Sequence, residues 1–248
     1  MEDLKGTTAL VTGAGRGFGR AIATALAAAG AVVVGVSRDG ARLAKVRAEI
    51  GDAFVPVAAD AADPALADRL IAEHRPRTLV LNAGASPVSR PLQEHTWETF
   101  SRNWEVDVKH VFQWIRRALL LPLDPGSTVI TLSSGAALRG SPISGGYAGA
   151  KATIRFITGY AAIESDRAGL DIRFTALLPG LTPATDLGAA AVAAYADREG
   201  TTLDAFLERL GPPLTPQQVG AGVLDLATAA AQPDTAYLIG PAGLTALE

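Results

Sequence analysis

Short apolar runs alternate with longer amphipathic stretches along the whole chain. The short runs carry apolar residues at consecutive positions, which is typical of parallel strands that helices cover on both faces. We therefore expect strands at positions 8–12, 31–37, 54–58, 78–82, 128–132, 171–178 and, as the last element, 236–239.

Stretches with helical periodicity connect these runs. Helices are expected over about 17–29, 39–50, 64–74, 97–121, 147–167 and 215–230, with a helix-prone, Ala-rich segment at 182–213. This alternation predicts an α/β protein with a single doubly wound parallel β-sheet and helices on both faces, a Rossmann-like fold. Since no linker or repeat divides the sequence, we expect one domain over residues 1–248.

Composition narrows the class of protein. Of the 248 residues 48% are hydrophobic, enough for a full core. Cysteine is absent, which excludes disulfides, thiol catalysis and thiolate metal sites. A formal charge of −3 without basic runs argues against nucleic acid as the main partner. His74, His95 and His110 show no ligand spacing, so no metal site is predicted.

The apolar segments are too short for a membrane protein. The longest, residues 21–36, is broken by Gly30, and the first residues are acidic and basic instead of forming an apolar signal. We expect no secretory signal and no membrane partner, and predict a soluble cytoplasmic protein.

A glycine-rich turn follows the first strand. Positions 12–19 read TGAGRGFG, which holds four glycines within seven residues. Phe18 occupies the place of the third glycine in the strict G-x-G-x-x-G fingerprint, so the fitting pattern is T-G-x-x-x-G-x-G. A tight strand-to-helix connection without a ligand is the alternative. The glycine density favours a site where a pyrophosphate approaches the amides of a helix N-terminus.

Four further motifs follow later strands. They are Asn82-Ala83-Gly84, then Ser134, then YAGAK at 147–151, and finally Pro179-Gly180. With the glycine turn, their order and spacing resemble the short-chain dehydrogenase/reductase family over nearly the whole chain. The resemblance implies an NAD(P)-dependent oxidoreductase that acts on a carbonyl/secondary alcohol pair.

Tyr147 and Lys151 lie one helical turn apart and share a helix face. A phenol with a pKa of about 10 is a poor base at neutral pH, and a nearby ammonium group lowers that pKa. Tyr147 can then exchange a proton with the substrate oxygen, to which Ser134 donates a hydrogen bond. By itself such a pair is usually an ordinary helix pair. Ser134 and the glycine turn favour catalysis, and the resemblance implies that Lys151 also holds the nicotinamide ribose.

One catalytic position departs from the family pattern. The family carries a V-N-x-x-G segment before the fifth strand, whereas this chain has VDVKH at 106–110, with Asp107 in the place of the asparagine. The resemblance implies that Asp107 joins the catalytic set and holds the water chain that the asparagine maintains. An ionised carboxylate offers only acceptors, and its charge opposes phenolate formation. The alternatives are a tolerated swap, a charge paired with Lys109 or Arg102, and direct pairing with Lys151.

The end of the second strand bears on cofactor choice. Ser37 stands where an acidic residue would select NAD, Arg38 follows it, and Arg16 lies in the glycine turn. Two guanidinium groups can hold a 2′-phosphate, so we predict NADP over NAD. The alternative is a solvated Arg38 paired with Asp39.

The resemblance also assigns the remaining cofactor contacts. Asp60 and Ala61 should flank the adenine, and a threonine should meet the carboxamide. Since Ala184 stands at the usual threonine position, Thr182 is ranked before Thr185. The full expected set is Gly13, Arg16, Gly17, Phe18, Gly19, Ser37, Arg38, Asp60, Ala61, Asn82, Ala83, Gly84, Tyr147, Lys151, Pro179, Gly180 and Thr182.

These observations favour an NADP-dependent carbonyl reductase. The loop segments 85–91, 135–145 and 183–213 carry Ala, Gly, Ser and Leu, which favours a neutral or largely apolar substrate. The small residues Ala148, Gly149, Ala150 and Ala152 fit a helix-mediated homodimer or homotetramer, or packing within the chain. The alternative function is a dinucleotide-binding sensor on the same fold, weakened in catalysis by Asp107. A sensor would not need Ser134, Tyr147 and Lys151 together.

Overall fold

An eight-stranded β-sheet forms the centre of the computed structural model, which describes residues 4–230 and 234–247. The strand order is β3-β2-β1-β4-β5-β6-β7-β8, and β1 to β7 pair in parallel. The strands are β1 Thr8–Thr12, β2 Val32–Ser37, β3 Phe54–Ala58, β4 Thr78–Leu81, β5 Thr128–Leu132, β6 Arg173–Pro179, β7 Ala236–Gly240 and β8 Gly243–Ala246. The predicted Rossmann-like α/β class is confirmed.

The last strand departs from the prediction. The sequence pattern closes the chain at 236–239, whereas β8 follows and pairs antiparallel with β7. A tight turn joins the two strands, and Gly243 has a φ of +106°, a conformation that glycine tolerates best. Because β8 is short and mostly exposed, it carries no apolar run by which the sequence could reveal it.

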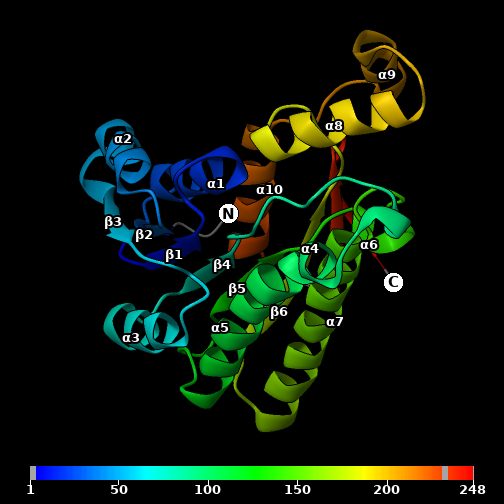
Figure 1. Cartoon of the computed structure of the whole chain (residues 1–248). Helices are drawn as coiled ribbons and strands as arrows, with labels where there is room; N and C mark the ends of the chain where they lie inside the picture. Colours follow the sequence, from blue (N-terminus) through cyan, green and yellow to red (C-terminus); the bar gives the residue numbers. More distant parts are fainter. Residues whose placement is uncertain (1–3, 231–233, 248) are drawn as a thin grey trace.

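Helices flank the sheet on both faces (Figure 1). Among the described residues they are α1 Gly17–Ala28, α2 Gly40–Ile50, α3 Pro64–His74, α4 Trp97–Asn103, α5 Lys109–Leu120, α6 Ala136–Arg139, α7 Gly145–Ala168, α8 Asp186–Arg198, α9 Leu203–Leu210 and α10 Pro216–Thr228. Side-chain caps fix several starts. Asp63 accepts from the amide of Ala65 ahead of α3, and Thr215 and Gln218 form a capping box at α10. The helix α6 was not predicted, because four residues are too few for a periodic pattern.

The two faces of the sheet bury separate apolar cores. One core packs α1, α2 and α10 against strand residues such as Val11. The other packs α3, α5 and α7 against residues such as Leu10. Neighbouring strand residues thus point to opposite cores, which explains why the strands are apolar at consecutive positions.

The long helix predicted at 97–121 is interrupted. The segment consists of α4, a π-helical turn at Trp104–Val108, and α5. A π-turn inserts an extra residue into the helical repeat and is frequent at functional sites. Here it holds Asp107, whose exposure is only 1%.

The order of the strands locates the ligand crevice. The strands β1 to β3 extend the sheet to one side, and β4 to β7 extend it to the other side, so the strand order reverses between β1 and β4. Ligands of open α/β sheets bind at this switch point, beyond the carboxyl ends of the strands. The segments after β1, β4, β5 and β6 therefore meet at one edge. In Figure 1, α8 and α9 stand apart from the two helix layers.

Candidate active site

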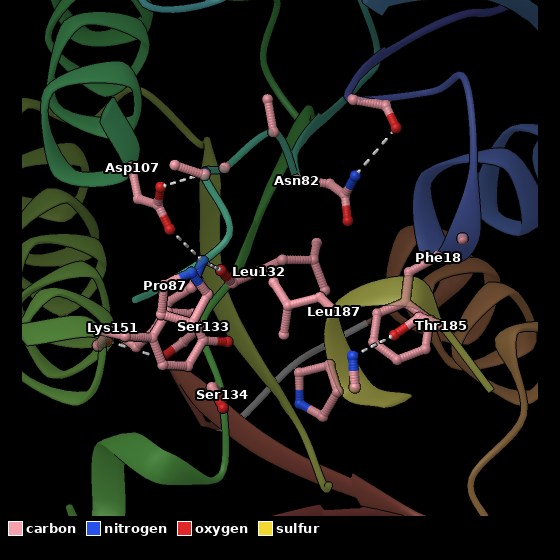
Figure 2. A pocket seen from close by; sticks show the side chains of 18 of the residues that line it. Phe18, Asn82, Pro87, Asp107, Leu132, Ser133, Ser134, Lys151, Thr185 and Leu187 are labelled. Atoms are coloured by element: carbon pink, nitrogen blue, oxygen red, sulfur yellow. Dashed lines mark hydrogen bonds and ion pairs between the residues drawn. The ribbon is translucent and has the colours of Figure 1, made fainter. Parts of the chain in front are cut away.

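A pocket of about 1290 Å³ lies at this edge. Its volume exceeds the usual 300–1,000 Å³ or so of a site for one drug-sized ligand, and so leaves room for a dinucleotide and a substrate. The expected residues that line it are Gly13, Arg16, Gly17, Phe18, Ser37, Arg38, Asp60, Ala61, Asn82, Ala83, Gly84, Asp107, Ser134, Tyr147, Lys151, Pro179, Gly180 and Thr182. Asp107, Lys151 and Ser134 lie on one side, and Phe18 and Thr185 on the other (Figure 2).

Gly19 is not among the lining residues, and packing explains it. A Cβ at Gly19 would lie 2.1 Å from the carbonyl oxygen of Gly13 and 2.6 Å from Asn82 Nδ2. Asn82 Nδ2 itself donates to the carbonyl oxygen of Thr12 at 3.0 Å, which ties the end of β4 to the glycine turn. Part of the glycine pattern therefore serves this close backbone packing.

The N-terminus of α1 opens onto the pocket without a side-chain cap. Arg16 is the N-cap residue and makes no capping hydrogen bond, and the first turn holds no acidic residue. The first amides of a helix lack intrahelical acceptors and carry partial positive charge. The turn is thus suited to bind a pyrophosphate.

Basic side chains gather at the end of β2. Arg38 is exposed and has no ion pair or hydrogen bond to the described residues. Asp39 pairs with Arg42, at 3.0 Å between Oδ2 and Nε, so the predicted alternative of an Arg38–Asp39 pair is wrong. Arg42 also lines the pocket, although it is not in the predicted set. Its place in the first turn of α2, three residues after Asp39, is the sequence signal that could have indicated it.

Arg16 pairs with Asp186 at the start of α8. Both side chains are more than half exposed, and such pairs contribute only about 0–1 kcal/mol. Arg16 can therefore exchange this carboxylate for another anion at little cost.

Lys151 is fixed at the carboxyl end of β5. Its Nζ donates to the carbonyl oxygen of Leu132 at 3.0 Å, and the Ser133 hydroxyl donates to the carbonyl oxygen of Lys151 at 2.7 Å. These bonds anchor α7 to the strand that ends just before Ser134. The Nζ lies 5.6 Å from the centroid of the Tyr147 ring.

Close helix contact positions Tyr147. A Cβ at Gly146 would lie 2.0 Å from the carbonyl oxygen of Phe100, so only glycine lets α4 approach the start of α7 this closely. The Ser134 hydroxyl accepts from the amide of Ala136 at 3.2 Å, which leaves its own hydrogen for a ligand.

Asp107 forms a buried ion pair with Lys151. Its Oδ2 lies 3.2 Å from Lys151 Nζ, and the two side chains are 1% and 7% exposed. Its Oδ1 accepts from the amide of Ala85 at 2.8 Å, and Asn103 Nδ2 lies 3.4–3.5 Å from both oxygens. The predicted alternatives of pairing with Lys109 or Arg102 are wrong, and direct pairing with Lys151 is found.

The pair determines the charge state of Lys151. Burial alone lowers the pKa of Lys151. The negative charge of Asp107, the negative charge that Tyr147 carries when ionised, and the hydrogen bond to Asp107 together raise it by more, so the pKa lies above its ordinary value. Lys151 is therefore an ammonium ion at neutral pH with Asp107 as its counter-ion.

Comparison with known proteins shows the family to which the chain belongs. The sequence model of the short chain dehydrogenase family matches residues 7–196. The chain belongs to the short-chain dehydrogenase/reductase family. It is similar to sorbitol dehydrogenase of Cereibacter sphaeroides, with 33% identity over 72% of this chain and 71% of that protein. It is also similar to human L-xylulose reductase, with 34% identity over 65% and 66% of the two chains.

Solved structures extend the likeness over the whole fold. The 3-ketoacyl-(acyl-carrier-protein) reductase of Brucella melitensis, solved with NADH, has a TM-score of 0.78 and 28% identity over 95% of this chain and 97% of that one. No helix in the described parts of the chain is long and apolar enough to cross a membrane.

In this short-chain dehydrogenase/reductase, the two threonines that could meet the carboxamide already make hydrogen bonds within the protein. Thr182 is buried, donates to the carbonyl oxygen of Leu214 and accepts from the amide of Ala184. Thr185 accepts from the amide of Gly188 at 3.1 Å as the N-cap of α8. Since Thr185 retains its hydroxyl hydrogen, it can donate to a ligand in the pocket.

His110, at the family's usual glycine position, is buried beside the site. It is 1% exposed, and neither ring nitrogen has a hydrogen-bond partner among the described residues. Burial, and after it the positive charge of Lys151, lowers the pKa of His110 to about 3. The ring is therefore neutral in the folded state at physiological pH.

This neutral histidine predicts sensitivity to acid. Below pH 6.5 the unfolded chain takes up a proton that folded His110 does not, so stability is lost as the pH falls toward about 3. Between pH 7.5 and 5.0 we expect His110 to reduce the unfolding free energy by about 2 kcal/mol. Urea unfolding at both pH values, with His110→Gln as the non-titrating control, measures the difference. An unchanged pH dependence in the variant would contradict this assignment.

Proposed function

We propose that this short-chain dehydrogenase/reductase is an NADP-dependent oxidoreductase that reduces a carbonyl group to a secondary alcohol, with Tyr147 as the proton donor. The observation that carries the proposal is the position of Ser134 and Lys151 on one side of the pocket, opposite Phe18 in the first turn of α1, whose N-terminus is uncapped. The Tyr147 ring lies beside Lys151 and also lines the pocket. Such a pocket brings an anionic cofactor and a proton donor together.

The residues present fit the cofactor. The open amides of α1 suit the pyrophosphate, and Lys151 is an ammonium group suited to a ribose hydroxyl. When bound, the nicotinamide supplies the hydride that goes to the carbonyl carbon.

The chain's own side chains handle the substrate oxygen. Ser134 donates a hydrogen bond to it, and Tyr147 Oη transfers its proton to it as negative charge develops. Asp107 offsets the ammonium charge of Lys151, which favours the phenol over the phenolate. A phenol is the form that reduction requires, and this supports reduction as the physiological direction.

A hydride-transfer assay tests the function. Nicotinamide absorbance would be followed with NADPH and NADH over a panel of ketones, and with the oxidised cofactors over alcohols. We expect NADPH-dependent reduction of at least one ketone. Tight cofactor binding without turnover of any substrate would instead favour the dinucleotide-binding sensor.

NADP selectivity is attributed to Ser37, Arg38 and Arg16. We expect the double variant Ser37→Asp/Arg38→Gln to weaken NADPH binding by about 1.5–3 kcal/mol, since a charge-assisted contact is lost and a carboxylate faces the phosphate. NADH binding should strengthen. Fluorescence titration measures the affinity for NADPH and for NADH. The control is Arg69→Gln, which removes an exposed side chain of α3. A wild-type protein that binds NADH more tightly than NADPH would contradict the assignment.

We also propose self-association as a homodimer or homotetramer. The small residues at the start of α7 pack within the chain, since Ala148 and Ala150 are buried and Gly149 contacts Trp104. Support comes instead from exposed apolar side chains further along α5 and α7, which are Phe112, Leu120, Phe156, Tyr160 and Ile163. Sedimentation equilibrium tests the proposal.

A further inference from the structure

Part of the pocket lining is an apolar wall, and two of its side chains, Leu138 and Leu238, lie near Gly135, the residue that follows Ser134. Six side chains that form it are Pro87, Leu138, Ile143, Leu181, Leu187 and Leu238. Leu138 and Leu181 are 40% and 37% exposed, so apolar surface stands uncovered here. Arg139 also lines the pocket but is itself exposed, and its guanidinium group can remain hydrated.

The hydroxyl groups of Ser144 and Tyr195, which line the pocket, both bind the hydroxyl group of Ser141, which does not line it. Ser141 Oγ accepts from the amide of Ser144 at 3.1 Å and from the Ser144 hydroxyl at 2.7 Å. These two bonds use both of its lone pairs. Ser141 is therefore the donor in its hydrogen bond with Tyr195 of α8.

Tyr195 is left with a free donor. Its Oη accepts from Ser141, and its own hydroxyl hydrogen has no acceptor among the described residues. The side chain is partly buried and lines the pocket. Its ring stacks on Phe206, with centroids 6.3 Å apart and an interplanar angle of 12°, which fixes its orientation.

We infer that Tyr195 binds a second oxygen of the substrate, and that this substrate is a largely apolar ketone carrying one further hydrogen-bond acceptor. The inference rests on the proposed function, which places the reacting carbonyl at Ser134 and Tyr147. The wall then offers a donor at Tyr195 among largely apolar side chains, and Ser89, Arg139 and Thr185 also line the pocket.

A polyhydroxylated ketose fits this wall poorly. Its hydroxyl groups would leave water for apolar side chains, and every unpaired polar group costs free energy. A site without matching polar groups therefore discriminates against such a substrate. A largely apolar ketone with one second oxygen leaves fewer polar groups unpaired.

Matched substrates test the inference. Cyclohexanone and cyclohexane-1,4-dione share a ring and differ in one carbonyl, and erythrulose represents the ketoses. We expect the wild type to reduce the dione with the highest kcat/KM, and erythrulose at least about a hundredfold less well. Tyr195→Phe should lower kcat/KM for the dione about tenfold, through KM, and leave cyclohexanone unchanged.

Two further variants serve as controls for the role of Tyr195. Tyr237→Phe removes a hydroxyl from β7, outside the residues that line the pocket, and should leave the kinetics with both ring ketones unchanged. Ser141→Ala removes the donor that orients Tyr195 and should raise KM for the dione alone. Thermal unfolding of each variant checks that the fold is retained.

The outcomes separate the two proposals. Equal effects of Tyr195→Phe on both ring ketones would overturn the role of Tyr195, and a preference for erythrulose would overturn the substrate class, with the proposed function intact. A wild type that reduces neither ring ketone overturns the inference. If it also reduces no member of the wider ketone panel, the proposed function fails with it.

Discussion

Tyr147→Phe is expected to lower turnover at least about a hundredfold, the usual scale for a general acid–base group. The variant keeps the ring that packs beside Lys151 and removes only the proton donor. Cofactor affinity should change little, because the ammonium group of Lys151 and the glycine turn remain. Steady-state kinetics and NADPH titration of the same preparation measure both quantities.

The matched control is Tyr237→Phe, which makes the same chemical change on β7, outside the residues that line the pocket. It should retain wild-type turnover. If Tyr147→Phe also turned over near the wild-type rate, another residue would be the acid.

Asp107→Ala is expected to destabilise the protein by about 3–5 kcal/mol, because it leaves the Lys151 ammonium buried without its counter-ion. The sign with pH follows from the raised pKa of Lys151. A group whose pKa is raised on folding contributes its stability at neutral pH and loses it as the pH rises through the folded pKa. Urea unfolding at pH 7.5 measures the loss.

Asp107→Asn separates charge from shape. Asparagine can still accept from the amide of Ala85, so we expect a smaller loss of stability. Removing an anion beside the phenol and the ammonium group should move the acidic limb of the oxidation rate to lower pH. A pH–rate profile for both proteins measures the shift. Outright loss of activity in Asp107→Asn would show that the carboxylate itself takes part in the reaction.

The elements and motifs could be predicted because their signals are local. The strands at Phe54–Ala58 and Thr128–Leu132 and the helix at Pro64–His74 have the bounds that the apolar pattern predicts. Periodicity, turn glycines and the four-residue spacing of Tyr147 and Lys151 act over a few residues of chain. Such signals can therefore be recognised in the sequence before the fold is known.

The π-helical turn at Trp104–Val108 could not be predicted from such local signals. The sequence predicts one helix across Asp107 because every residue there suits a helix. The extra residue in this turn accompanies contacts of the buried carboxylate with Ala85 and Lys151, which are distant in the chain. No periodic pattern encodes these partners.

The order of elements, the sheet class and the candidate site motifs could be predicted from the residues alone, because each signal depends on residues close together in the chain. Which charges and hydroxyl groups meet became clear only from the folded structure. Asp107 pairs with Lys151 and not with a neighbour, Arg16 with Asp186 from 170 residues away, and Ser141 with Tyr195 from 54 residues away. These partners depend on which elements the fold places within reach of a side chain, and spacing along the chain carries no information about that.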